Sequence, residues 1–209
     1  MIAIIDYEAG NIRSVQKVLQ FIGADVEVTS QPEFILNADG VVLPGVGAFA
    51  DCTGSLRSKG LDVVTRQVIA RGTPFLGICL GYQMLFDYSE EDGGDGKTAP
   101  GLGIFRGSVK RIPGDLGLKV PHMGWNNLML RKESPLFSGL PADPYVYFVH
   151  SYHVDVEDKS IVAATSRYGI EMDVSICSGN VFCTQFHPEK SGDIGTMMLR
   201  NFVKVVYRG

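Results

Sequence analysis

The chain has 209 residues with 19 basic and 23 acidic side chains, so its formal net charge is −4. This length suits a single α/β domain with a sizeable core, and we expect residues 1–209 to form one domain. The absence of a basic cluster argues against nucleic acid and acidic membrane surfaces as partners. The sequence shows no apolar run typical of a membrane span, and its four cysteines form no CxxC pair, so we expect a cytoplasmic protein with free thiols.

The first half of the chain alternates between strand and helix patterns. Residues 2–6, an apolar run that ends at Asp6, predict a buried strand, and residues 12–22 carry apolar side chains at helical spacing. Further strands are predicted over residues 25–29 and 40–43, and a helix in two pieces over residues 48–71. This order of strand, helix and strand predicts an α/β fold with parallel pairing.

A lone cysteine follows the next apolar run. Residues 75–78 predict a strand, Cys79 lies at the turn, and residues 82–85 resemble the start of a helix. Gly77 and Gly81 are expected to let the backbone turn tightly around the cysteine, as glycines do in the nucleophile elbow of hydrolases. The start of a helix favours a thiolate, so Cys79 is the predicted nucleophile.

The second half of the chain has a different composition. Residues 89–96 are acidic and glycine-rich and predict a solvated loop, without the spacing of a calcium site. Short strands are predicted over the segments 104–112, 145–150, 161–166, 173–176 and 181–186. Cys177 and Cys183 flank the turn of the last hairpin, and a disulfide there is a minor alternative to free thiols. Trp125 lies among turn residues and is either a local core residue or an interface anchor.

A cysteine nucleophile needs a partner that holds and delivers a proton, and histidine suits this task near neutral pH. The best of four candidates is His187, which follows the strand 181–186 at a sheet edge where sites collect. Pro188 predicts an extended turn, so Glu189 would share a face with His187 and orient its ring as the third member of a triad. Without Cys79, the tripeptide would be more typical of a buried histidine beside an exposed glutamate.

The combination of this tripeptide with Cys79 between two glycines is far more specific for a catalytic site than the tripeptide alone. His150 and His153 form an HxxH pair without a third ligand nearby, so neither a metal nor any other cofactor is predicted.

Three segments resemble the signatures of class I glutamine amidotransferases, in the right order along the whole chain: residues 44–47 (PGVG), 77–83 (GICLGYQ) and 187–189 (HPE). Finer features resemble the branch of this family that serves imidazole glycerol phosphate synthase, namely DYEAGN, PGVGAF, HMGWN, YFVHSYHV and FHPEKSG. Val46 and Tyr82 separate the chain from sister branches, which often have proline and histidine there. Glu8 departs from the glycine that is common at its position.

The resemblance implies an open, mostly parallel doubly wound sheet with helices on both faces and an added antiparallel region. It also implies hydrolysis of L-glutamine to glutamate and ammonia by Cys79, His187 and Glu189. The oxyanion would be held by the backbone of Val46, Gly47 and Leu80. The residues implied to bind the substrate are Gly45, Gln83, Ser151 and Tyr152.

In this branch the ammonia passes to a separate (β/α)8 barrel synthase subunit, which forms imidazole glycerol phosphate and aminoimidazole carboxamide ribotide in histidine biosynthesis. The resemblance therefore implies a heterodimer. The residues implied to face the barrel are Asn11, Met123, Trp125 and Lys190.

Other functions remain open at this point. The chain could be the glutaminase subunit of an anthranilate or pyridoxal phosphate pathway, or a catalytically silent glutamine-sensing module on the same fold. A papain-like protease is disfavoured, because no tryptophan or second glycine cluster follows the nucleophile.

Overall fold

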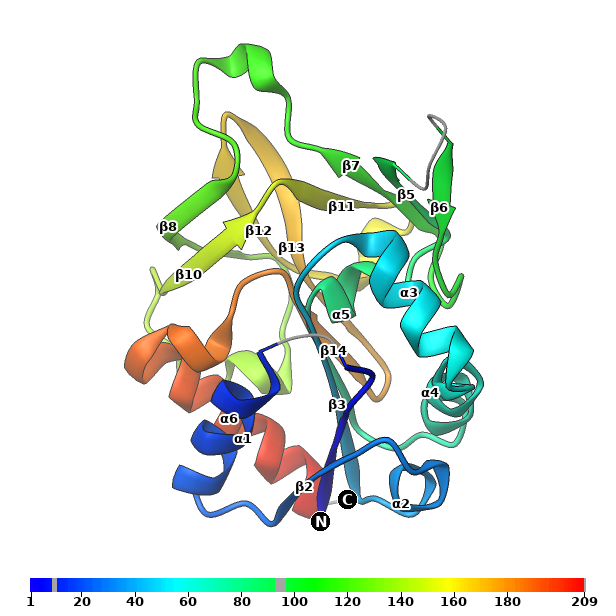
Figure 1. Cartoon of the computed structure of the whole chain (residues 1–209). Helices are drawn as coiled ribbons and strands as arrows, with labels where there is room; N and C mark the ends of the chain where they lie inside the picture. Colours follow the sequence, from blue (N-terminus) through cyan, green and yellow to red (C-terminus); the bar gives the residue numbers. More distant parts are fainter. Residues whose placement is uncertain (9–10, 93–96, 209) are drawn as a thin grey trace.

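A computed structural model describes residues 1–8, 11–92 and 97–208 and shows a central twisted sheet with helices on both sides (Figure 1). The main sheet has the strand order β2-β1-β3-β4-β14-β13-β11-β7-β5-β6, with β12 pairing with β13 and β9 with β12, while β8 and β10 form a separate pair. The strands β2, β1, β3, β4 and β14 are parallel, and the pairs from β14 to β7 are antiparallel. The predicted α/β fold with an added antiparallel region is confirmed.

The strands have these bounds: β1 Ile2–Ile5, β2 Val26–Thr29, β3 Gly40–Gly45, β4 Phe75–Cys79, β5 Tyr88–Asp92, β6 Thr98–Pro100, β7 Gly107–Arg111, β8 His122–Asn127, β9 Met129–Leu130, β10 Tyr145–His150, β11 Tyr152–Val156, β12 Val162–Tyr168, β13 Ile170–Ser178 and β14 Val181–Thr184. The helices are α1 Ile12–Phe21, α2 Pro32–Leu36, α3 Phe49–Ser58, α4 Leu61–Ala70, α5 Leu80–Gln83 and α6 Gly192–Arg208, together with short 3-10 turns that include Pro188–Lys190.

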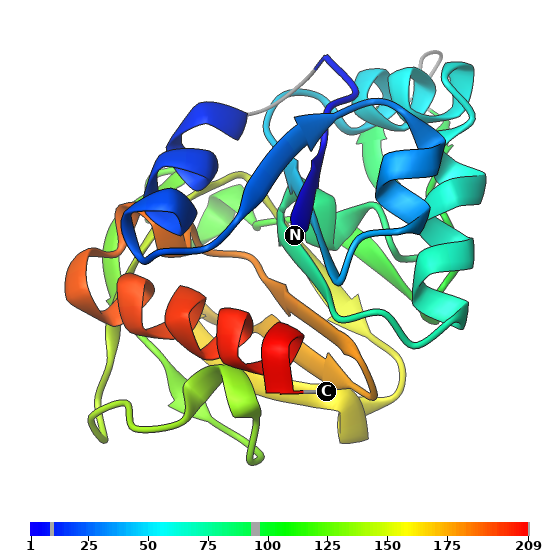
Figure 2. The ribbon, with the colours of Figure 1, turned by 90° about the horizontal axis from the view of Figure 1, so that it is seen from below.

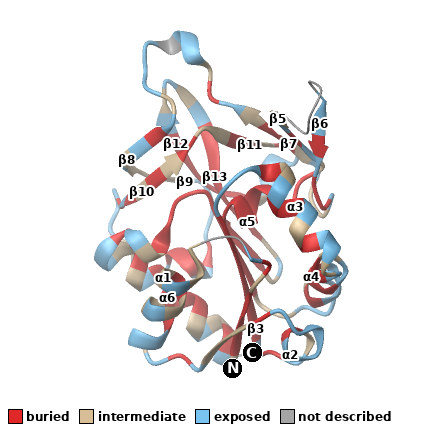
Figure 3. Cartoon of the chain, viewed as in Figure 1, coloured by how far each residue is buried: buried red, intermediate tan, exposed pale blue. Residues whose placement is uncertain are grey.

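The parallel half of the sheet buries both of its faces. In β1, Ile2 and Ile4 point into one apolar core and Ala3 and Ile5 into the other, because successive side chains of a strand alternate. The helices α1 and α6 cover the first face, and α2, α3 and α4 cover the second (Figure 2). Figure 3 shows the resulting layers, with buried strands between helices whose outer faces are exposed. Because helices cover both faces of these strands, the side chains on both faces are apolar, and the strands are continuous apolar runs in the sequence.

Several predictions for the second half were wrong. Residues 88–92 form the strand β5 rather than part of a solvated loop, and Ser89 in it is fully buried. The segment around Trp125 is the strand β8, paired with β10, rather than a turn. The strands of this region also carry polar residues, so their pairing with neighbours defines them better than their own pattern. Residues 93–96 of the predicted solvated loop lie outside the residues that the structure describes, as do residues 9–10.

The four cysteines are free thiols, as predicted. Cys183 lies opposite Ile176 in the hairpin, whereas Cys177 lies opposite Phe182 and belongs to the other apolar core. The two thiols therefore point to opposite faces of the sheet, which rules out the hairpin disulfide. Within the described ranges, no helix combines the length and the apolar character needed to cross a bilayer.

Candidate active site

Cys79 lies at the last position of β4, where the chain turns into α5. Its backbone has φ +55° and ψ −109°, a conformation that a residue with a side chain rarely adopts. The register of the sheet places Cys79 beside Gly45 at the end of β3, and β14 pairs with the other edge of β4. The carboxyl ends of three parallel strands thus meet at the cysteine, the usual place for a site in an open α/β sheet.

Gly77 and Gly81 leave room for the tight turn, as predicted, because a Cβ atom on Gly77 would lie 3.1 Å from the carbonyl oxygen of Gly81 across the turn. The left-handed conformation belongs to the cysteine itself, and neither Gly77 nor Gly81 has a positive φ. A Cβ atom on Gly81 would lie 1.9 Å from the carbonyl oxygen of Leu43. A Cβ atom on Gly45 would lie 2.7 Å from the hydroxyl of Tyr7. Only glycine lets β3 approach the elbow so closely.

The helix after the nucleophile differs from the prediction. It is the single turn α5, Leu80–Gln83, and it starts directly after the cysteine rather than at residue 82. A helix of one turn has a small dipole, so side chains near the sulfur must supply most of the local field.

His187 and Glu189 form a buried pair at the end of the segment that follows β14. The Nδ1 atom of His187 lies 2.8 Å from the Oε1 atom of Glu189, and the two side chains are 2% and 1% exposed. Ser191 fixes the backbone here, because its hydroxyl donates to the carbonyl of His187 and accepts from the N–H of Tyr147. The Nε2 atom of His187 has no hydrogen-bond partner within the described residues.

The charges around His187 favour its protonated form. Burial lowers the pKa of the imidazole, but the neighbouring Cys79 sulfur and the hydrogen-bonded carboxylate of Glu189 outweigh burial and raise it to about 10. The ring is therefore an imidazolium at neutral pH when the sulfur beside it is a thiolate. Nδ1–H donates to Glu189, which leaves the proton on Nε2 available.

Cys79 and His187 line one cavity of about 510 Å³. The structure thus brings together most of the residues singled out in the sequence. Those that line the cavity are Asn11, Val46, Gly47, Cys79, Leu80, Gln83, Ser151, Tyr152, His187 and Lys190. Gly45 and Glu189 do not line the cavity and instead contact residues that do. Met123 and Trp125 lie outside it on β8, 62% and 56% exposed, so Trp125 is not a core residue.

The end of β3 and the loop that follows it are each held by a residue that was not predicted from the sequence. The hydroxyl of Tyr7 donates to the carbonyl of Pro44 at 2.8 Å, and the thiol of Cys52 donates to the carbonyl of Val46 at 3.5 Å. Burial raises the pKa of the Cys52 thiol to about 11, so it stays protonated and serves as a donor. Gly47 has φ +117°, a conformation that favours glycine.

Glu91 is another cavity residue that sequence reasoning missed. It comes from β5, and its Oε2 atom accepts a hydrogen bond of 2.8 Å from the N–H of Phe49 at the start of α3. Burial raises the pKa of this carboxyl. Its surroundings in the sequence are acidic and glycine-rich, and no pattern distinguishes it from a solvated side chain.

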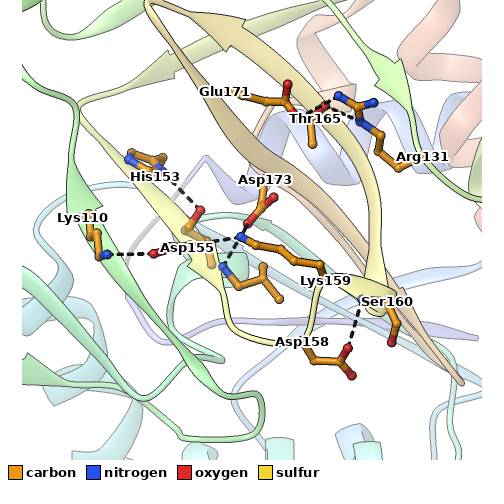
Figure 4. Close-up of polar contacts among 12 residues, drawn as sticks. Lys110, Arg131, His153, Asp155, Asp158, Lys159, Ser160, Thr165, Glu171 and Asp173 are labelled. Carbon is orange, nitrogen blue, oxygen red and sulfur yellow. Dashed lines mark hydrogen bonds and ion pairs between the residues drawn. The ribbon is translucent and has the colours of Figure 1, made fainter.

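A second cavity, of about 420 Å³, lies against the antiparallel strands and is lined by paired charges (Figure 4). Lys159 contacts Asp155 and Asp173, and Arg131 contacts Glu171. His153 lines this cavity, whereas His150 lines the first one, so the HxxH pair is split between two sites. Across the part of the chain that the structure describes, no three His, Cys, Asp or Glu side chains are grouped to bind a metal.

Comparison with known proteins agrees with this geometry. A family model described as "Glutamine amidotransferase class-I" matches residues 3–206. A protein of Thermosynechococcus vestitus named "Imidazole glycerol phosphate synthase subunit HisH" is 53% identical, covering 98% of this chain and 97% of that protein. The protein of the same name from Moorella thermoacetica is 50% identical, covering 98% of this chain and 95% of that protein.

A solved structure titled "Crystal structure of glutamine amidotransferase" covers 99% of both chains with a TM-score of 0.75 and 20% sequence identity, which shows a shared fold. The fold agreement, together with the family match over nearly the full length, leads to one conclusion. This chain belongs to the class I glutamine amidotransferase family.

Proposed function

We propose that this chain is the glutaminase subunit of an imidazole glycerol phosphate synthase and hydrolyses L-glutamine to L-glutamate and ammonia. The observation that carries the proposal is the meeting of Cys79 with the buried His187–Glu189 pair at one cavity. Relatives of about 50% identity over nearly the whole chain, named as subunits of that synthase, favour it over the anthranilate and pyridoxal phosphate pathways. A complete nucleophile, acid and orienting carboxylate favour an enzyme over a silent sensing module.

In the first step, the Cys79 sulfur attacks the side-chain amide carbon of glutamine and the carbonyl oxygen becomes an oxyanion. Backbone N–H groups of Leu80 and of Val46 and Gly47 are the donors that we assign to this oxyanion. One such donor typically contributes about 3–4 kcal/mol to lowering the barrier. The strained backbone of Cys79 presents the sulfur to the cavity in the manner of a nucleophile elbow.

In the second step, the tetrahedral intermediate collapses and the amide nitrogen leaves. His187 delivers its Nε2 proton to that nitrogen, so that ammonia departs and a γ-glutamyl thioester remains on Cys79. The Nε2 atom of His187 then takes a proton from a water molecule, and this water attacks the thioester. The attack releases glutamate and restores the Cys79 thiolate. Glu189 keeps the ring oriented and stabilises its charge throughout.

The cavity also has groups that suit the rest of glutamine. Glu91 places a carboxylate at the cavity wall, where it would pair with the α-ammonium group of the substrate. Gln83, Ser151 and Tyr152 line the cavity beside it and are the residues that we assign to substrate positioning.

Ammonia is mostly protonated at neutral pH and is then a poor nucleophile, so a glutaminase of this kind must pass it on through a dry route. We assign the receiving subunit to a (β/α)8 barrel synthase that docks over the cavity mouth. Asn11 and Lys190 line that cavity, and a Cβ atom on Gly192, just after Lys190, would lie 3.8 Å from the ring of Trp125. The exposed side chains of Met123 and Trp125 would therefore continue the same surface.

The test is a glutaminase assay on the purified chain, with and without the barrel subunit and its nucleotide substrate. We expect slow hydrolysis by the chain alone and faster hydrolysis in the complex. Equal turnover in both arms would count against the partner, and copurification with an anthranilate or pyridoxal phosphate enzyme would favour the alternative pathways. A Cys79→Ser chain that still hydrolyses glutamine would exclude the proposed nucleophile.

A further inference from the structure

The Cys79 sulfur has a polar neighbour that the mechanism above does not use. The side-chain Nε2 atom of Gln185 lies 3.6 Å from the Cys79 sulfur, and Gln185 is fully buried. We infer that Gln185 is a further catalytic residue, whose amide N–H stabilises the Cys79 thiolate. We also infer that a buried hydrogen-bond chain through His122 and His150 fixes the orientation of that amide. This inference rests on the proposed role of Cys79 as the nucleophile.

The orientation of the amide follows from its other contacts. The Nε2 atom of Gln83 lies 3.0 Å from the carbonyl oxygen of Tyr152, which can only accept a hydrogen bond. The same NH2 group therefore donates its second hydrogen to Oε1 of Gln185, at 2.9 Å. Since Oε1 of Gln185 is engaged there, its NH2 group is the end that faces Cys79.

The carbonyl of Tyr152 is held by a second donor. It lies 2.9 Å from Nδ1 of His150, so this ring nitrogen must carry a hydrogen. Burial lowers the pKa of His150 to about 3, and the ring is neutral at physiological pH. Its Nε2 atom is therefore an acceptor, and it receives a hydrogen bond of 3.0 Å from Nδ1 of His122.

The hydrogen-bond network continues to the strand β8. Burial lowers the pKa of His122 to about 4, so its Nε2 atom is also an acceptor and faces the Nδ2 group of Asn126 at 3.4 Å. Asn126 is fixed by backbone groups, because its Nδ2 donates to the carbonyl of Arg167 and its Oδ1 accepts from the N–H of Asn127. The His122 ring is further held by near-parallel stacking between Phe148 and Tyr168, with centroids 4.7 and 4.0 Å away.

Each hydrogen bond of this network thus has one possible donor and one possible acceptor, from Asn126 on β8 to the sulfur of Cys79. A buried network with all its members satisfied is rigid, and rigidity is what a stabilising group beside a nucleophile needs. The titratable groups that face the network are His153 and His187, which both lie near His150, the carboxyl of Glu189 beyond His187, and the thiol of Cys79 at the end of the network. Neither His122 nor His150 changes charge between about pH 5 and pH 9.

The experiment is alkylation of Cys79 by iodoacetamide in the full chain across a range of pH, with the Cys79→Ser chain as the blank for the three other thiols. Gln185→Met keeps the length of the side chain but removes the donor, and Gln185→Glu places an acceptor beside the sulfur. We expect the pH midpoint of alkylation to rise by about one to two units in Gln185→Met, and kcat of glutamine hydrolysis to fall about 10-fold to 100-fold. Gln185→Glu should shift the midpoint at least as far.

His150→Leu tests the orienting chain, and His153→Leu is its matched control, because His153 is equally buried but lies on the second cavity. We expect a smaller rise of the midpoint in His150→Leu and none in His153→Leu. An unchanged midpoint in both Gln185 variants overturns the role of Gln185, and equal effects of His150→Leu and His153→Leu overturn the orienting chain. A wild-type chain that is alkylated normally but never hydrolyses glutamine would instead contradict the proposed function.

Discussion

The raised pKa of His187 predicts a pH-dependent contribution to stability. A group whose pKa rises on folding stabilises the folded state fully below its unfolded value of about 6.5, and this contribution is lost as the pH rises through about 10. The contribution amounts to about 1.4 kcal/mol for each pKa unit of the shift. Urea unfolding of the wild type and His187→Gln should therefore show a difference in the free energy of unfolding that shrinks between about pH 6 and pH 10. Parallel curves would show that the imidazolium is not stabilised in the fold.

Glu91 predicts a specific loss of substrate binding. Glu91→Gln keeps the shape of the side chain and its acceptor for the N–H of Phe49 but removes the charge that would pair with the α-ammonium group of glutamine. We expect KM for glutamine to rise about 10-fold or more, with a smaller change in kcat, since the contact is made equally in the ground and transition states. Steady-state kinetics of the complex measure both constants. A fall in kcat at constant KM would place Glu91 in the chemical step instead.

The three residues of the proposed triad could be predicted from the sequence, whereas the groups around them could not. Cys79 ends an apolar strand, and His187 and Glu189 follow another strand two positions apart. The extended turn predicted at Pro188 was wrong, because Pro188–Lys190 form a 3-10 turn, which still brings Nδ1 of His187 within 2.8 Å of Glu189. Glu91 and Gln185 are isolated polar residues whose role depends on which strands are neighbours in the assembled sheet, so no local pattern predicts them.

At the scale of single elements, the elbow at the end of β4 depends on the close approach of β3. The sequence predicted a strand, a turn and a helix there, with Gly77 and Gly81 leaving room for a tight turn. The structure shows that these glycines are needed for space, and that the strained backbone is that of Cys79. The contact between β3 and α5 is a tertiary feature, so the need for glycine at position 81 to admit Leu43 could not be predicted from the local sequence.

Gly81→Ala should destabilise the fold through this contact. The added Cβ would lie 1.9 Å from the carbonyl oxygen of Leu43, which is backbone and cannot move aside alone. We expect a loss of roughly 2–4 kcal/mol in the free energy of unfolding, measured by urea denaturation. The matched control is Gly54→Ala within α3, where an added Cβ meets nothing within 4 Å and should stabilise the helix by up to about 1 kcal/mol. Equal stability of the two variants would contradict this account of the elbow.

At the scale of the whole molecule, the parallel half of the sheet was predictable and the antiparallel half largely was not. Strands covered on both faces are continuous apolar runs, which stand out in the sequence. Strands such as β8 and β5 mix polar and apolar residues and are defined by their partners, β10 in one case and β6 and β7 in the other. The cavity lies where the two halves meet, and for this reason only part of its wall could be foreseen.

The surface around the cavity mouth predicts where the synthase subunit docks. Trp125→Ala removes a large exposed side chain from this surface and should weaken the complex more than about 10-fold in Kd, without lowering the stability of the free chain. Phe21→Ala is the matched control, since Phe21 is 79% exposed but lies at the end of α1 away from Asn11. Isothermal titration calorimetry with the barrel subunit measures Kd for both variants, and urea denaturation measures the stability of each free chain. A larger effect of Phe21→Ala would move the interface to another face.

The proposed reaction depends on a covalent bond between Cys79 and the γ-glutamyl group of the substrate. Peptide mapping by mass spectrometry of the complex, quenched in acid during turnover of glutamine, tests whether this bond forms. The peptide that carries Cys79 should hold a γ-glutamyl group, and the Cys79→Ser chain should hold none and should be inactive. Turnover without this adduct, or turnover that survives Cys79→Ser, would contradict the proposed mechanism.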